Sequence, residues 1–219
     1  MKTSNYSTIL FDLDGTLTDP KIGVTKAIQY ALKRFDIEVV NPDELQKFIG
    51  PALIDSFQKY YSLSPKDASK AVDYYREYYS EKGVYENEVY AGIPALLKEL
   101  KSLGKTLAVA TAKPTFYANI VLEHFDLAHF FTEIVGSNLD NTRNKKVEII
   151  SHVLQQLKVK ADFNVLMIGD REYDILGAKA CGIDSIGVMY GYGSLEELKQ
   201  AEPKCIVGTV EELTGILLQ

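Results

Sequence analysis

Six short apolar runs, rich in Ile and Val, constrain the fold of this 219-residue chain most strongly. The runs are apolar almost throughout, not at every second position, which is typical of parallel strands that are covered on both faces. Helical patterns such as 92–104 and 146–157 separate them. This alternation predicts a doubly wound, Rossmann-like α/β core with a parallel sheet. The predicted strands are 8–14, 106–111, 133–137, 164–170, 184–190 and, more weakly, 205–209.

The segment 18–87 has a different pattern, with no convincing strand. Apolar residues recur in it at three- and four-residue spacing, as in amphipathic helices. Asn41 before Pro42, and Ser64 before Pro65, are typical of helix N-caps with proline at the first helical position. We therefore expect a small helical domain, 18–87, inserted into a core domain formed by 1–17 and 88–219.

The composition fits an ordinary soluble protein, with 46% hydrophobic and 25% charged residues. A net charge of −6 argues against nucleic acid or an anionic membrane as the main partner. The two cysteines, Cys181 and Cys205, have no metal-type spacing and suit a reducing compartment. No apolar run is long enough to cross a bilayer. We expect a cytoplasmic protein, either a monomer or a weak homodimer.

Polar side chains follow several of the predicted strands. Asp12 and Asp14 end the first, Thr111 ends the second, and Asp170 ends the fourth, with Asp174 at the start of the next helix. Ligands of open parallel sheets bind outside the carboxyl ends of the strands. Singly, each residue could be a helix cap or an ordinary strand residue.

Together, these carboxylates need a counter-charge. Two like charges about 4 Å apart repel by roughly 4 kcal/mol at an effective dielectric constant of 20. An all-oxygen ligand set without histidine or cysteine suits a hard cation, above all Mg²⁺. A second positive charge is expected from Lys146, which lies at the edge of the apolar stripe of helix 146–157, whereas Lys145 points about a hundred degrees away. A lysine in the first turn opposes the helix dipole, so Lys146 is not there to stabilise the helix.

These motifs resemble, in order, the four motifs of the haloacid dehalogenase-like hydrolase superfamily. They are "DLDGT" at 12–16, Thr111 after an apolar strand, the lysine that opens a later helix, and "GDREYD" at 169–174. The resemblance covers essentially the whole chain, and the inserted helices stand where that superfamily has a helical cap. "YENEVYAGIPALLKELK" leading to "LAVATAKP" is most similar to the phosphoglycolate phosphatase-like branch.

The resemblance implies a Mg²⁺-dependent phosphatase of a small phosphate ester. Asp12 would attack phosphorus and form an aspartyl-phosphate, and Asp14 would act as general acid and then as general base. Lys146 would neutralise charge between Asp12 and the phosphoryl oxygens. The implied metal ligands are the Asp12 side chain, the Asp14 carbonyl and Asp170. Asp174 would either hold these ligands in place without binding the metal or orient Lys146. The implied phosphate-binding residues are Thr111, Gly15, Thr16, Ala112 and Lys113.

Two positions bear on specificity. Arg171 stands where this family often has a small hydroxyl residue, and we expect its side chain in solvent. "FIGPALIDS" at 48–56 is the candidate cap loop for contact with the leaving group, although a plain connection between helices would explain it equally well. Nothing in the loop names a substrate.

Several alternatives remain open. A 5'-nucleotidase, a pyrophosphatase or a phosphotransferase of the β-phosphoglucomutase type would share the same four motifs. Thr16 argues against the mutase, which resembles "DxDGV" at this position. A receiver-type signalling domain also uses an acidic cluster, a hydroxyl residue and a lysine, but it lacks the insertion and is about half as long.

Overall fold

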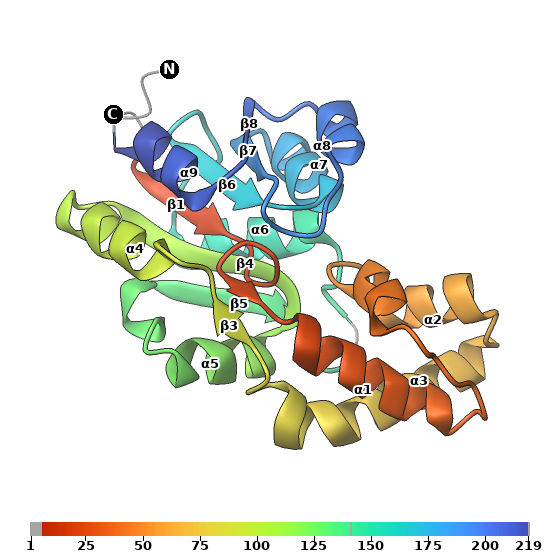
Figure 1. Cartoon of the computed structure of the whole chain (residues 1–219). Coiled ribbons are helices and arrows are strands. Elements are labelled where there is room, and N and C mark those ends of the chain that lie inside the picture. The colour runs from red at the N-terminus through yellow and green to blue at the C-terminus, as the bar shows by residue number, and fades with distance from the viewer. Residues whose placement is uncertain (1–5, 141, 219) are drawn as a thin grey trace. The chain divides into compact units, whose positions relative to one another are not determined.

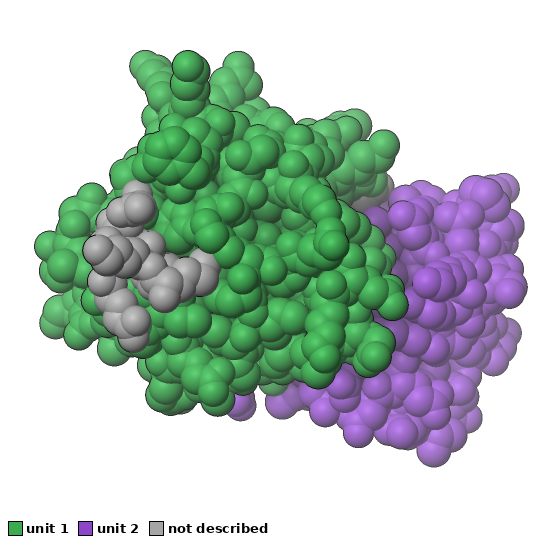
Figure 2. Space-filling model, turned by 90° about the horizontal axis from the view of Figure 1, so that it is seen from above, with its two compact units in different colours: residues 1–19, 89–219 green, residues 20–88 purple. Residues whose placement is uncertain are grey.

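The computed structural model describes residues 6–140 and 142–218. The chain divides into two compact units. Unit 1 comprises Met1–Asp19 and Val89–Gln219, and unit 2 comprises Pro20–Glu88; Figure 2 colours the two units separately. Each unit is described by itself below.

Unit 1 contains a six-stranded parallel sheet with the strand order β5-β4-β1-β6-β7-β8 (Figure 1). Each parallel neighbour is reached through a crossover, as a doubly wound α/β fold requires. The predicted fold class is confirmed. The sheet's strands are β1 (Thr8–Phe11), β4 (Thr106–Pro114), β5 (Glu133–Ser137), β6 (Val165–Gly169), β7 (Asp184–Val188) and β8 (Cys205–Val207).

Helices lie on both faces of this sheet (Figure 1). A buried cluster around Leu10, Ile150 and Met167 joins the sheet to α6 and α7 on one face. Because successive strand side chains alternate between faces, Phe11 points to the opposite face, where its ring meets the edge of Phe131. The described helices of unit 1 are α4 (Ile93–Ser102), α5 (Thr115–His124), α6 (Lys146–Leu157), α7 (Glu172–Cys181), α8 (Leu195–Ala201), α9 (Val210–Leu217) and the 3-10 turn η3 (Ala128–Phe130).

Unit 2 is helical, and its caps are those expected from the sequence. The Asn41 side chain accepts a hydrogen bond from the Asp43 N–H at 3.1 Å, and Ser64 Oγ accepts one from the Asp67 N–H at 3.1 Å. Phe57 and Tyr79 are buried between its helices. The described elements are α1 (Lys21–Lys33), the 3-10 helix η1 (Pro42–Phe48), α2 (Leu53–Tyr61), α3 (Pro65–Tyr78) and the π-helical turn η2 (Tyr79–Gly83).

The main differences from the predicted strands concern β1, β4 and the segment 18–87. β1 ends at Phe11, not at residue 14, because the chain turns after Asp12 and the Leu17 N–H donates to Leu13 O. β4 continues three residues beyond Thr111, with an irregularity between Ala110 and Pro114. The segment 18–87 was expected to lack strands, but β2 (Thr18–Asp19) pairs with β3 (Glu88–Val89).

Among the described helices, none combines the length and the apolarity that a membrane span requires.

Candidate active site

Asp12 stands at the carboxyl end of β1, the strand between β4 and β6 in the sheet. Its N–H donates to Ile168 O at 2.9 Å, which keeps its backbone beside β6. The side chain is only 4% exposed, and its Oδ1 accepts a hydrogen bond from the Leu13 N–H at 2.8 Å. A buried carboxylate is thus held in one orientation at the expected edge of the sheet.

Two further carboxylates meet Asp12 there. Asp170 follows β6 and Asp174 lies in the first turn of α7, and both are fully buried. One carboxylate oxygen from each of Asp12, Asp170 and Asp174 lies within 4.8 Å of the others. Burial, reinforced by the charges of Asp174 and Asp12, raises the pKa of Asp170 well above its ordinary value. Burial also raises the pKa of Asp174 to about 6, although Lys146 opposes it.

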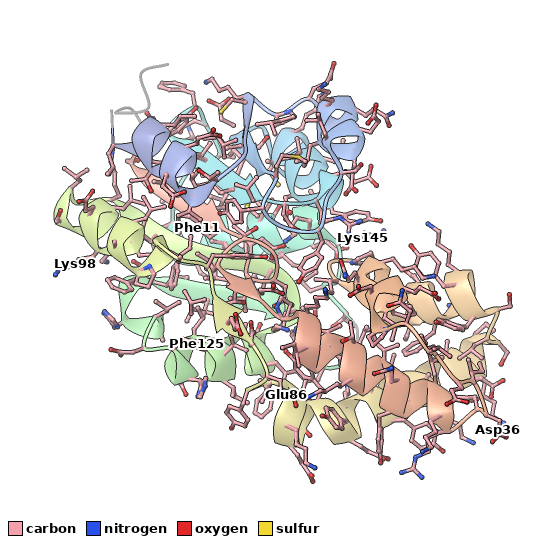
Figure 3. The ribbon with its side chains drawn as sticks, viewed as in Figure 1. Phe11, Asp36, Glu86, Lys98, Phe125 and Lys145 are labelled. Carbon is pink, nitrogen blue, oxygen red and sulfur yellow. The ribbon has the colours of Figure 1, made fainter. Side chains whose placement is uncertain are left out.

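Lys146, the first residue of α6, places its ammonium group among these carboxylates. Its Nζ lies 3.1 Å from Asp12 Oδ1 and 2.6 Å from Asp174 Oδ1, and it donates to Ala110 O at 3.0 Å. Burial alone would lower the pKa of Lys146, but the two carboxylates outweigh it and raise the pKa. Lys145, labelled in Figure 3, is exposed, as expected from its different direction.

Asp14 and Lys113 form a second buried ion pair at the same edge. Lys113 Nζ lies 2.7 Å from Asp14 Oδ2, and their side chains are 5% and 15% exposed. Burial raises the pKa of Asp14, and the Lys113 charge opposes this rise. Lys113 was expected at the substrate phosphate; in this structure its ammonium group contacts Asp14.

The expected phosphate-binding residues lie on the segments around this pair. Thr111 is buried, and its Oγ1 accepts a hydrogen bond from the Lys113 N–H at 3.2 Å. Ala112 O accepts one from Ser137 Oγ at 2.9 Å. Thr16 is fully buried, and its hydroxyl has no hydrogen-bond partner within 6–140 and 142–218.

Gly15 is required by the close approach of its backbone to Asp170. Its φ is +83°, which favours glycine, and a Cβ built on it would lie 2.2 Å from Asp170 Oδ2. The turn after β1 therefore packs directly against the carboxylate that ends β6.

Arg171 is not in solvent, and that expectation was wrong. Its Nε lies 2.8 Å from Glu197 Oε1, and its side chain is 14% exposed. Its N–H also donates to Asp174 Oδ2 at 3.1 Å, which helps to fix Asp174 at the start of α7. The sequence did not reveal Glu197 as a partner because it lies on α8, 26 residues further along the chain.

Tyr192 is a residue that the sequence analysis missed. Its N–H donates to Asp170 Oδ2 at 2.7 Å. A main-chain contact has no residue-type signature, so only the glycines on either side, Gly191 and Gly193, could have marked this loop as one that approaches another backbone.

The residues present fit a divalent cation. Asp170 Oδ2 is occupied by the Tyr192 N–H, but its Oδ1 is buried and has no hydrogen-bond partner among the described residues. Such an atom is costly to bury unless something electropositive meets it. The oxygen-only donors, without histidine or cysteine, suit a hard cation. Asp12, Asp170 and the Asp14 carbonyl are the candidate ligands.

The model of the haloacid dehalogenase-like hydrolase family matches residues 9–188, which include every motif described above. The chain belongs to this family.

Curated relatives of this haloacid dehalogenase-like hydrolase cover nearly its whole length. A 5'-nucleotidase of Pseudomonas aeruginosa is 46% identical over 97% of the chain and 96% of the relative. A phosphoglycolate phosphatase of Vibrio cholerae is 31% identical over 96% of both chains. The tyrosine-protein kinase PtkA of Mycobacterium tuberculosis is 34% identical over 95% of this chain and 72% of its own.

A solved structure agrees with this assignment. The crystal structure of a predicted phosphatase from Clostridium acetobutylicum superposes with a TM-score of 0.94 at 49% identity, over 97% of this hydrolase and 98% of that chain. The resemblance to phosphoglycolate phosphatases is therefore confirmed at the level of the family. The chain is a phosphatase of the haloacid dehalogenase-like family.

Proposed function

We propose that the protein is a phosphomonoesterase that cleaves a small phosphorylated metabolite through an aspartyl-phosphate on Asp12. The observation that carries this proposal is the contact of Asp12 with Lys146 beside the buried Asp170. A carboxylate that must approach an anionic phosphoryl group needs positive charge on both sides of the reaction centre: Lys146 supplies it on one side, and a cation held by Asp170 would supply it on the other.

The first chemical step is attack on phosphorus. Asp12 Oδ1 is held by the Leu13 N–H and Lys146, so the attacking atom is Oδ2. As the Oδ2–P bond forms, the bond between phosphorus and the leaving alkoxide breaks. Asp14 gives its proton to that alkoxide; burial raises the pKa of this carboxyl above its ordinary value, which is the direction that a general acid requires.

The second step reverses the role of Asp14. Its carboxylate takes a proton from a water molecule as the water oxygen attacks phosphorus. The P–O bond to Asp12 breaks, inorganic phosphate leaves, and Asp12 is regenerated as a carboxylate. Lys113 restrains Asp14 between the steps through their ion pair. One buried acid thus serves both proton transfers.

Lys146 neutralises the charge that the phosphoryl oxygens and Asp12 share, and Asp174 holds its ammonium group in place. A divalent cation, proposed to be Mg²⁺ and held by Asp12, Asp170 and the Asp14 carbonyl, would stabilise the negative charge that develops on the phosphoryl oxygens. Thr111, Gly15, Thr16 and Ala112 are proposed to bind the phosphoryl group. Preorganised positive charge and hydrogen-bond donors are the main source of catalysis for phosphate esters.

We propose a nucleoside 5'-monophosphate as the substrate, ahead of phosphoglycolate. Identity of 46% to the 5'-nucleotidase, against 31% to the phosphoglycolate phosphatase, supports this order.

We propose that Pro20–Glu88, unit 2, acts as the cap and that 48–56 contains residues that recognise the leaving group. The protein is proposed to act in the cytoplasm, as a monomer or a weak homodimer.

The test is a phosphate-release screen with and without Mg²⁺. The panel contains nucleoside monophosphates, phosphoglycolate, sugar phosphates and pyrophosphate, and EDTA supplies the metal-free control. We expect the highest kcat/KM with a nucleoside monophosphate, and activity only with the cation. Higher kcat/KM for phosphoglycolate would overturn the substrate class. A requirement for a phosphoryl acceptor would replace hydrolysis by phosphotransfer.

A further inference from the structure

The loop after β7 contacts Asp170 through main-chain atoms. The Tyr192 N–H donates to Asp170 Oδ2 at 2.7 Å, a short hydrogen bond to a charged acceptor. This bond engages Oδ2, and Oδ1 is left without a hydrogen-bond partner among the described residues. Oδ1 is therefore the oxygen available to a cation. The position of the Tyr192 peptide therefore sets the orientation of Asp170.

The residues on both sides of Tyr192 are glycines for steric reasons. A Cβ on Gly193 would lie 1.9 Å from Asp170 O, and a Cβ on Gly191 would lie 2.5 Å from the Cβ of Asp170. Only a bare backbone can pack this closely. However, glycine also gives the backbone more conformational freedom, so the same sequence that permits the contact does not hold the loop rigid.

The side chain of Tyr192 supplies the missing restraint. Its hydroxyl donates a hydrogen bond to Asp19 Oδ1. Asp19 ends β2 and is the last residue of unit 1 before the chain enters unit 2. Two other tyrosines of the same unit, Tyr90 and Tyr190, are in edge-to-face contact with each other, with ring centroids 4.9 Å apart.

We propose that Tyr192 is a positioning residue for the cation site: its hydroxyl, bound to Asp19, holds the glycine-flanked loop so that its N–H orients Asp170 toward the metal. This inference rests on the proposed function only in taking Asp170 as a metal ligand. In this proposal Tyr192 acts on the cation through its contact with Asp170.

The test measures cation affinity directly, without turnover. The dissociation constant for Mg²⁺ is obtained by calorimetric titration and from the Mg²⁺-induced rise in Tm. We expect Tyr192→Phe, which removes the hydroxyl and keeps the N–H, to weaken Mg²⁺ binding by about 10-fold, as loss of a group behind a metal ligand does. The lost kcat/KM should return at saturating Mg²⁺.

Matched variants separate positioning from stability. Asp19→Ala should weaken Mg²⁺ binding as much as Tyr192→Phe, whereas Asp19→Asn, whose amide oxygen still accepts the hydrogen bond, should stay within about 2-fold of the wild type. Tyr6→Phe is the control, because Tyr6 makes the same kind of hydrogen bond, to Asp184 Oδ2 at 2.6 Å, at the other end of β7. It should leave Mg²⁺ binding unchanged.

Two results would overturn the inference. Unchanged Mg²⁺ affinity in Tyr192→Phe, or in Asp19→Ala where only that variant folds, would remove Tyr192 from the cation site while leaving the proposed phosphatase intact. Absence of Mg²⁺ binding by the wild type, with calorimetry and Tm in agreement, would overturn the cation site and this inference together. Asp19→Ala keeps the first result accessible if Tyr192→Phe fails to fold.

Discussion

Lys113 Nζ lies 2.7 Å from Asp14 Oδ2, and the two buried side chains form an ion pair at the carboxyl edge of the sheet. Removing one partner of a buried pair leaves the other charge without compensation. The pair therefore links the stability of the fold to the protonation of the proposed acid and base.

Lys113→Met is expected to lower the free energy of unfolding by about 3 kcal/mol at pH 8. The loss should be smaller at pH 5. Burial already raises the pKa of Asp14, and without Lys113 it rises further, so the folded variant binds a proton that the unfolded chain releases. Its stability then increases as the pH falls through the folded-state pKa. Urea unfolding at both pH values measures this.

Lys204→Met is the control for that variant, because Lys204 pairs with Asp184 at a half-exposed site. Exposed pairs contribute less than about 1 kcal/mol. Equal losses in the two variants, or a loss in Lys113→Met that does not vary with pH, would contradict the role given to the buried pair.

Asp12→Asn is expected to abolish phosphate release, by at least about 10⁴-fold, since an amide oxygen is a poor nucleophile toward phosphorus. The fold should be retained, because asparagine has nearly the same shape. Intact-mass spectrometry of acid-quenched wild type should detect one added phosphoryl group, and the variant should lack it. Turnover in the purified variant would remove Asp12 as the nucleophile.

Lys146→Met is expected to reduce kcat by about 10²- to 10³-fold, the usual effect of removing one charge-stabilising donor. Lys145→Met is its matched control: the neighbouring lysine is exposed, and its replacement should change kcat little. The measurement is kcat of both variants and the wild type from steady-state kinetics. Comparable losses would mean that general positive charge, not the contact with Asp12, is what matters.

The metal-free protein is expected to become more stable as the pH falls from 8 to 5. Burial raises the pKa of Asp170 and brings that of Asp174 to about 6. A carboxyl with a raised folded-state pKa destabilises the fold above that pKa, and the penalty fades as the pH falls through it toward the unfolded value. Tm should therefore rise with acidification in EDTA.

Mg²⁺ should raise Tm more at pH 8 than at pH 5, because the cation competes with protons for the same carboxylates. Asp170→Asn should raise the Tm of the metal-free protein and remove the response to Mg²⁺. A metal-free Tm that falls between pH 8 and pH 6 would contradict this electrostatic account.

The fold could be predicted because its signals are local and repeated. Continuous apolar runs mark the covered strands, and α6 begins and ends at the predicted residues, Lys146 and Leu157. β2 could not be predicted, since two residues such as Thr18–Asp19 carry no periodicity. The extension of β4 beyond Thr111 was hidden for a related reason: the irregularity before Pro114 interrupts the pattern.

The meeting of Asp12, Asp170 and Lys146 could be predicted because parallel strands deliver their carboxyl ends to one edge. Pairings between side chains could not. Lys113 could have met either a phosphate or a carboxylate, and Arg171 either solvent or Glu197. These choices depend on three-dimensional proximity, which residue type alone does not encode.

Because β2 pairs with β3, the two ends of the segment that forms unit 2 lie close together in space. Whatever lies between Asp19 and Glu88 can lengthen, shorten or change its sequence without altering the separation of the strands that carry the carboxylates. With unit 2 in its proposed role of recognising the leaving group, specificity can diverge in one continuous stretch of the chain while the residues of the chemistry stay fixed in the other unit.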